Sequence, residues 1–175
     1  MGTALVTGAT SGIGEEFCWQ LAAAGHDLVL VARREDALAA LAASLTNVAG
    51  VRAEVIAADL STEEGCARVA ARLDVGGPAD TEKPDLRPVD LLVNNAGFGL
   101  GSAFLDNSLE NEINGLNVMV RAVMTLAHHA GISMRSRGRG AILNVGSVAS
   151  RTGAGTYSAH KAWVVAFTEG LAAEL

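Results

Sequence analysis

Short aliphatic runs alternate with helical stretches along this 175-residue chain. The runs are short enough for buried strands, and the stretches between them repeat apolar side chains at helical spacing, as Leu38, Leu41 and Leu45 do. We expect strands at 4–6, 28–32, 51–57, 89–93 and 140–145, and helices at 13–24, 35–45, 110–129 and 158–175, with a further helix capped by Ser61. This order predicts a Rossmann-type α/β fold, a doubly wound parallel sheet with helices on both faces, in a single domain over 1–175.

Two segments are expected to be loops. All three prolines fall between Gly76 and Pro88, which predicts a long loop there. The short basic run Arg135–Arg139 lies between two apolar segments and predicts a solvated connection between a helix and a strand.

The composition excludes several classes of protein. Half of the residues are hydrophobic and 18% are charged, so the chain can bury a core, and the net charge of −6 argues against a nucleic-acid surface. Cys18 and Cys66 are too few and too far apart for a disulfide framework or a zinc site, and no metal is expected. No uninterrupted apolar stretch reaches transmembrane length, and no signal-peptide pattern precedes the first strand. We therefore expect a cytoplasmic protein with a small-molecule partner and no membrane partner.

The first strand leads into a glycine-rich turn that opens a helix, Thr7-Gly8-Ala9-Thr10-Ser11-Gly12-Ile13-Gly14. Glycine permits a tight turn and lets a pyrophosphate approach the backbone closely. The helix N-terminus adds free N–H groups and a partial positive charge that favour phosphate. The turn therefore predicts a dinucleotide site, with a purely structural turn as the alternative.

The end of the second strand indicates which dinucleotide binds. An acid at this place accepts from the ribose 2′-hydroxyl of NAD, whereas a 2′-phosphate needs a cation. The strand ends in Ala32, Arg33 and Arg34, and guanidinium groups bind phosphate through paired donors. We predict NADP, as NADPH, rather than NAD. The alternative is that both arginines are merely solvated near Glu35 and Asp36.

Tyr157 and Lys161 carry the strongest chemical signal, because residues four apart lie on the same face of a helix. Reduction of a carbonyl by hydride needs a proton donor near the oxygen, and a neighbouring ammonium favours the ionised form of a phenol. Ser147, at the end of the fifth strand, can hydrogen-bond the substrate oxygen and stabilise charge on it. We predict hydride transfer between NADP(H) and a carbonyl or alcohol, with Tyr157 as general acid and base.

These motifs, in this order, resemble the short-chain dehydrogenase/reductase family. The family's TGxxxGxG pattern matches the glycine turn, its NNAG segment matches Asn94-Asn95-Ala96-Gly97, and its Ser and Tyr-x-x-x-Lys match the residues above. The resemblance implies that Asp59 accepts from the adenine amino group and that Leu60 contributes its backbone. It implies a cofactor-binding set of Gly8, Ser11, Gly12, Ile13, Gly14, Arg33, Arg34, Asp59, Leu60, Asn94, Ala96, Gly97, Tyr157 and Lys161. A turn role for Asp59 and a structural hydrogen-bonding role for the two asparagines are the alternatives.

The resemblance also implies a fourth catalytic residue beside Ser147, Tyr157 and Lys161. Asn117 matches the family's asparagine, which kinks the long helix so that a backbone carbonyl holds a water next to the lysine. Asn114 is the rival, although the Leu-Asn-Val sequence around Asn117 fits the family pattern better. By the same resemblance, Lys161 also holds the nicotinamide ribose.

Two departures from the family pattern bear on activity. The interval from Ser147 to Tyr157 is shorter than usual, which alters one wall of the substrate pocket. The sequence stops at Leu175, before the family's last strands, its Pro-Gly segment and its mobile substrate lid. One alternative function is therefore a catalytically silent NADP(H)-binding or scaffold protein. Another is a protein–protein module, because the helices at 110–129 and 158–175 resemble those that join subunits in the family, which implies a homodimer or homotetramer.

Overall fold

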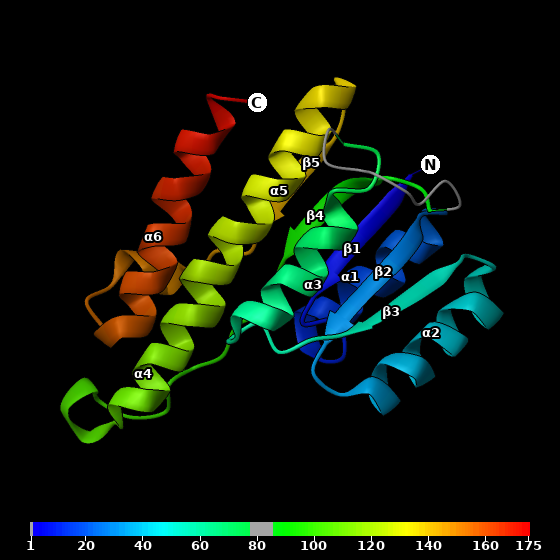
Figure 1. Cartoon of the computed structure of the whole chain (residues 1–175). Helices are drawn as coiled ribbons and strands as arrows, with labels where there is room; N and C mark the ends of the chain where they lie inside the picture. Colours follow the sequence, from blue (N-terminus) through cyan, green and yellow to red (C-terminus); the bar gives the residue numbers. More distant parts are fainter. Residues whose placement is uncertain (1, 78–85) are drawn as a thin grey trace.

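A single sheet of five parallel strands, in the order β3-β2-β1-β4-β5, forms the centre of the computed structural model, which describes residues 2–77 and 86–175 (Figure 1). The strands are β1 (Thr3–Thr7), β2 (Asp27–Ala32), β3 (Ala53–Ala57), β4 (Val89–Asn94) and β5 (Ala141–Asn144). β1 is buried along its whole length and pairs with β2 on one side and β4 on the other. The strand order therefore reverses at β1, and in such sheets ligands bind at the carboxyl ends of the strands beside that point.

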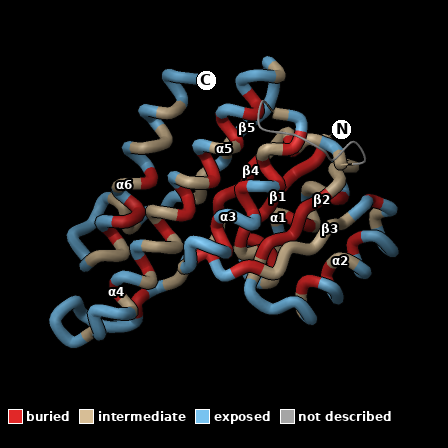
Figure 2. The backbone as a smooth tube through the Cα atoms, in the orientation of Figure 1, coloured by how far each residue is buried: buried red, intermediate tan, exposed pale blue. Residues whose placement is uncertain are grey.

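Helices cover both faces of the sheet. α1 (Gly12–Ala23) and α2 (Glu35–Ala49) pack on one face, where Cys18, Leu38 and Leu45 join the buried cluster that contains Val6. α3 (Glu63–Leu73) and α5 (Ala122–Arg137) pack on the other face. The buried tube segments in Figure 2 lie mostly along the strands and the inner sides of these helices. The predicted Rossmann-type fold is confirmed.

The long helix predicted at 110–129 is a rod of three parts, which Figure 1 shows as one continuous column. α4 (Leu109–Leu116) passes into a π-helical turn, η2 (Asn117–Arg121), and then into α5. A short 3-10 turn, η1 (Phe104–Asp106), precedes the rod. After β5, a second 3-10 turn, η3 (Val148–Arg151), leads into α6 (Gly155–Ala172).

Several predicted boundaries were wrong. Thr62, not Ser61, caps α3: its hydroxyl accepts from the Gly65 N–H at 3.0 Å. The basic run is not wholly a loop, because α5 continues through Arg137 and ends at Gly138, whose φ of 66° reverses the chain. The last helix starts at Gly155 rather than at 158 and therefore contains Tyr157. Most of the predicted proline-rich loop lies outside the described residues.

Across residues 2–77 and 86–175, no helix is both long and apolar enough to cross a membrane. Within the same ranges, no cluster of three His, Cys, Asp or Glu side chains has the arrangement of a metal site.

Candidate cofactor and catalytic site

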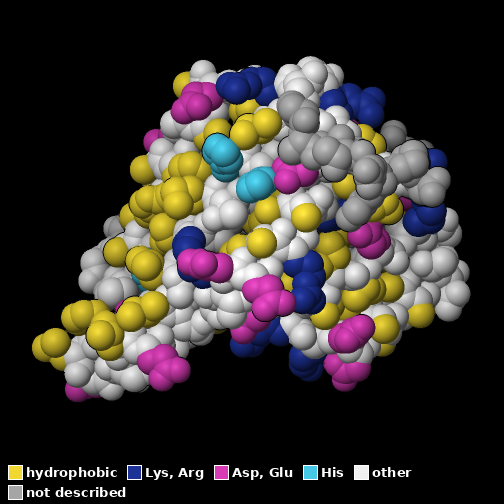
Figure 3. Space-filling view, viewed as in Figure 1, with side chains coloured by type: hydrophobic (Ala, Val, Ile, Leu, Met, Phe, Trp, Pro, Cys, Tyr) yellow, Lys and Arg dark blue, Asp and Glu magenta, His cyan; other side chains and the backbone are white. Residues whose placement is uncertain are grey.

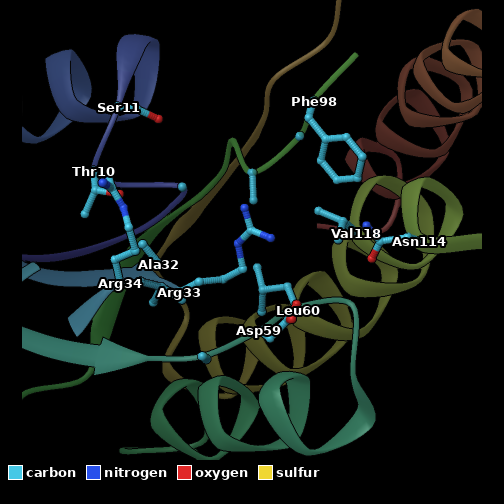
Figure 4. A pocket seen from close by; sticks show the side chains of 15 residues that line it. Thr10, Ser11, Ala32, Arg33, Arg34, Asp59, Leu60, Phe98, Asn114 and Val118 are labelled. Atoms are coloured by element: carbon cyan, nitrogen blue, oxygen red, sulfur yellow. The ribbon is translucent and has the colours of Figure 1, made fainter. Parts of the chain in front are cut away.

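A pocket of about 670 Å³ opens at the carboxyl ends of β1, β2, β3 and β4. Figure 4 shows Arg33 and Arg34 entering it from the end of β2, with Thr10 and Ser11 on the side of the glycine turn and Phe98, Asn114 and Val118 on the opposite side. The remaining lining residues are Gly8, Val31, Ala32, Ala58, Asp59, Leu60, Ala96 and Gly97. Eight of the predicted cofactor-binding residues line this one pocket: Gly8, Ser11, Arg33, Arg34, Asp59, Leu60, Ala96 and Gly97.

The glycine turn has the backbone geometry that only glycine adopts readily. Gly8 and Gly12 have φ of 68° and 54°, in the left-handed region. Gly14 lies against the turn, since a Cβ there would be 2.1 Å from the Gly8 carbonyl oxygen. The side chain of Ile13 is exposed, and Ser11 makes no capping hydrogen bond at the start of α1. The hydroxyl of Ser11 and the first N–H groups of α1 are therefore placed to receive a phosphate.

Thr7 and Asn95 join this turn to the end of β4. The N–H groups of Asn95 and Ala96 donate to Thr7 Oγ1 at 2.9 and 3.0 Å, and Asn95 Nδ2 donates to the Thr7 carbonyl at 3.0 Å. Asn94 is buried and donates to Asn144 Oδ1 at 2.9 Å, so its side chain links β4 to β5 and does not line the pocket. Asn94 and Asn95 therefore each have a hydrogen-bond partner, Asn144 and Thr7 respectively.

Arg33, Arg34 and Asp59 are exposed at the rim of the pocket. The Ser61 N–H donates to Asp59 Oδ1 at 2.9 Å, as in an Asx turn. Partial burial raises the pKa of Asp59, but this hydrogen bond and the positive charge of Arg33 outweigh it, and the net pKa is lowered. Asp59 is therefore an ionised acceptor that both ends a turn and faces the pocket.

Lys161 connects the cofactor pocket to the predicted catalytic residues. Its side chain is buried, and Nζ donates to the Val145 carbonyl at 2.7 Å. A Cβ at Gly97, which lines the pocket, would lie 3.7 Å from the same Nζ. Burial lowers the pKa of the Lys161 ammonium. The ammonium thus lies where the ends of β4 and β5 meet.

Tyr157 and Ser147 lie on segments that pack together. Tyr157 is half-buried one turn before Lys161 on α6, and η3, which follows Ser147, packs against α6. The half-buried Ser147 accepts from the Ala149 N–H at 3.1 Å, which leaves its hydroxyl proton for another acceptor.

The two candidate asparagines occupy different places on the rod. Asn114 lines the cofactor pocket, whereas Asn117 does not. The π-helical turn begins at Asn117 and packs against α6, so the helix departs from α geometry at the residue for which a kink is expected. The predicted cofactor-binding set did not include Thr10, Val31, Ala58, Phe98 and Val118, which also line the pocket. Thr10 lies within the glycine turn and Phe98 directly follows the Asn94–Gly97 segment, so their positions could have been expected. For Val118, the only signal was its position four residues after Asn114, which places both side chains on the same face of the helix.

Comparison with known proteins bears on this arrangement. Residues 2–175 match the family model described as short chain dehydrogenase. The chain belongs to the short-chain dehydrogenase family. This short-chain dehydrogenase is 35% identical to the very-long-chain 3-oxoacyl-CoA reductase of Laccaria bicolor, over 98% of its own length and 50% of that protein.

Two solved structures superpose on the short-chain dehydrogenase with a TM-score of 0.91. One is a short-chain dehydrogenase from Sphingobium yanoikuyae in complex with NADPH, which is 36% identical, with 100% of this chain and 66% of that chain covered. The other is the bulky-bulky ketone specific alcohol dehydrogenase from Comamonas testosteroni, which is 34% identical, with 100% and 68% covered. The chain thus spans about half to two thirds of these relatives.

Proposed function

We propose that this short-chain dehydrogenase transfers hydride between NADP(H) and a carbonyl or alcohol, with Tyr157 as general acid and base. The observation that carries the proposal is the position of Lys161. Its ammonium lies beside Gly97, at the edge of the cofactor pocket, and one helical turn from the phenol. Lys161 is therefore close both to the pocket that we assign to the dinucleotide and to the residue that we assign as proton donor.

NADP fits the residues that are present. A Cβ at Gly12 would occupy open space at the start of α1, and Arg33 and Arg34 bring two positive charges to the rim. The Sphingobium relative was solved with NADPH, which supports the same cofactor here. We therefore assign the turn to the pyrophosphate, the arginines to the 2′-phosphate and Asp59 to the adenine amino group.

Four side chains of the protein are assigned a part in the reaction, in addition to the cofactor. Bound NADPH supplies the hydride. The Tyr157 phenol donates a proton to the carbonyl oxygen, and the Lys161 ammonium stabilises the phenolate that remains. The Ser147 hydroxyl donates a hydrogen bond to the same oxygen. Asn117, at the π-helical turn that packs against α6, is assigned to the proton relay that reprotonates the phenol.

The subunit interface is proposed along α4, α5 and α6. Hydrophobic side chains gather on this side of the molecule in Figure 3. The large ones exposed on the rod and on α6 are Leu109, Ile113, Leu116, Met124, Ile132 and Val165. A homodimer or homotetramer would cover these side chains.

The test is to incubate the chain with NADPH and a panel of ketones and to follow the loss of NADPH absorbance. We expect wild-type turnover, and a loss of about 10²-fold or more for Tyr157→Phe, because the variant has no proton to donate. Unchanged activity of Tyr157→Phe would refute the assigned mechanism. A wild-type chain that binds NADPH but reduces no ketone would favour the silent cofactor-binding protein.

A further inference from the structure

A buried carboxylate lies under the start of the helix that carries Tyr157. Glu112 on α4 is only 7% exposed. It accepts from Asn107 Nδ2 at 2.6 Å, and its other oxygen accepts from the hydroxyl of Thr156. A buried charge is costly unless it is hydrogen-bonded, and Glu112 makes no salt bridge within the described ranges. These two donors are therefore what keep the carboxylate in place.

The same hydrogen bonds keep Glu112 ionised. The Thr156 hydroxyl and then the Asn107 amide lower the pKa of Glu112, while burial raises it and the neighbouring His160 lowers it further. The net pKa lies below the ordinary value, so the acceptor is a carboxylate at neutral pH. Hydrogen bonds to an ionised acceptor are stronger than those between neutral groups.

The network continues to the segment that follows β4. Asn111 Nδ2 donates to Asn107 Oδ1 at 3.0 Å and to the Leu100 carbonyl at 3.1 Å. Leu100 lies three residues after Gly97, which lines the cofactor pocket. A chain of hydrogen bonds thus runs from beside the cofactor pocket, through Asn107 and Glu112, to the residue that precedes Tyr157.

The first turn of α6 depends on such outside contacts. Its N-cap, Ala154, has no side chain that could cap the helix, and Gly155 has a φ of 73°. Thr156 is held by Glu112 on one side of Tyr157, and on the other side Ser158 Oγ lies 3.0 Å from Thr152 Oγ1. The tyrosine is therefore positioned by its two neighbours rather than by a helix cap.

Gly115 on α4 packs closely against Leu100 and lies next to His160 of α6. A Cβ at Gly115 would lie 2.7 Å from Leu100 Cδ2 and 3.5 Å from His160 Cε1. Figure 1 shows the start of α6 next to α4, and the two helices are in contact. This contact between the two helices places the Glu112 carboxylate within reach of Thr156.

We propose that Glu112 is a positioning residue that holds the first turn of α6 through Thr156, and thereby sets the Tyr157 phenol against the cofactor pocket. This inference rests on the proposed function, because Glu112 would position Tyr157, the proposed proton donor. A displacement of about 1 Å at a reacting group can cost about 10²-fold in rate. Loss of this contact should therefore affect the chemical step more than cofactor binding.

The kinetic test compares Glu112→Ala, Thr156→Val and the double variant in the full chain. Each should lower kcat for ketone reduction by about 10- to 100-fold, with the Kd for NADPH changed by less than about twofold. The double variant should be no worse than the worse single variant, because both remove one interaction. Thr156→Ser keeps the hydroxyl and should keep wild-type kcat. Glu110→Ala, on an exposed acid of the same helix, is the matched control and should match wild type.

A second readout does not need catalysis. Tyr157 is the only tyrosine of the chain, so ¹³C-labelled tyrosine produces an NMR signal from this side chain alone. We expect one sharp ring signal in wild type and Glu110→Ala, and a shifted or broadened one in Glu112→Ala and Thr156→Val.

An unchanged tyrosine signal together with wild-type kcat in Thr156→Val would overturn the inference, even if Glu112→Ala fails to fold. A wild-type chain that reduces no ketone would refute the proposed function alone, because the tyrosine signal still decides the role of Glu112.

Discussion

At the scale of single residues, the proposed preference for NADP rests on the charge at the end of β2. Arg33 and Arg34 stand where a ribose-binding acid would favour NAD, and Arg33 also lowers the pKa of Asp59 across the pocket rim. The positive charge therefore lies at the part of the rim that we assign to the adenosine of the cofactor.

The double variant Arg33→Ala/Arg34→Ala should weaken NADPH binding by about 10- to 100-fold, because charge-assisted hydrogen bonds to a phosphate are lost. NADH binding should change by less than about threefold, since NADH has no 2′-phosphate. Fluorescence titration with each nucleotide measures both values. Arg52→Ala is the matched control, because Arg52 pairs with Asp27 at the opposite end of β2. Equal losses for NADPH and NADH would contradict the assignment.

At the scale of elements, α3 begins at a hydroxyl that satisfies one free N–H of its first turn. Thr62→Ala should lower the free energy of unfolding by about 1 kcal/mol, as measured by urea denaturation. Ser61→Ala should change it by much less, because the Ser61 side chain makes no capping bond in the described structure. A larger loss of stability in Ser61→Ala than in Thr62→Ala would contradict this and identify Ser61 as the N-cap of α3.

The order of elements could be predicted from sequence, whereas their ends could not. Runs such as Leu28–Ala32 are apolar throughout and have few alternatives to a buried strand. Ser61 and Thr62 are both good N-caps, and the choice between them depends on Asp59, whose carboxylate takes the Ser61 N–H. The extension of α5 through Arg137 depends on tertiary partners, because Arg137 pairs with Asp90 at 3.0 Å.

The residues of the candidate site could likewise be predicted from the sequence only in part. The glycine turn, Arg33 and the Tyr157 motif were visible because their spacing is local and their chemistry is specific. The contact between Glu112 and Thr156 joins residues 44 apart, and neither belongs to a recognisable motif. Only the packing of α4 on α6 brings them together, so no local pattern could have indicated the pair.

At the scale of the whole molecule, ion pairs at the amino ends of the strands make stability depend on pH. The hydrogen bond from Arg52 holds the pKa of Asp27 below its ordinary value of 3.8, with further help from Arg87. Because the pKa of Asp27 is lower in the folded state, its ionised carboxylate stabilises the folded protein above pH 3.8. That stabilisation is lost as the pH falls through the pKa of Asp27 in the folded state.

The free energy of unfolding should therefore decrease as the pH falls below about 4, as measured by urea denaturation across that range. Asp27→Asn should be less stable than wild type at neutral pH and should show a shallower decrease in acid. An identical pH dependence in wild type and variant would exclude Asp27 as a source.

The proposed subunit interface is tested at the same scale. Met124→Asp places a charge in the exposed apolar surface of α5 and should shift the protein toward a monomer in sedimentation velocity. Val48→Asp is the control, because Val48 is equally apolar and 76% exposed but lies on α2. A shift caused by Val48→Asp and not by Met124→Asp would place the interface on another face.

The most direct measurement of hydride transfer uses NADPH that carries deuterium at the transferred position of the nicotinamide. The chain is incubated with this cofactor and a ketone, and the alcohol is analysed by mass spectrometry. Hydride transfer with Tyr157 as proton donor predicts one deuterium on the carbinol carbon with wild type and a strongly reduced yield with Tyr157→Phe. An alcohol without deuterium, or an equal yield from the variant, would contradict it.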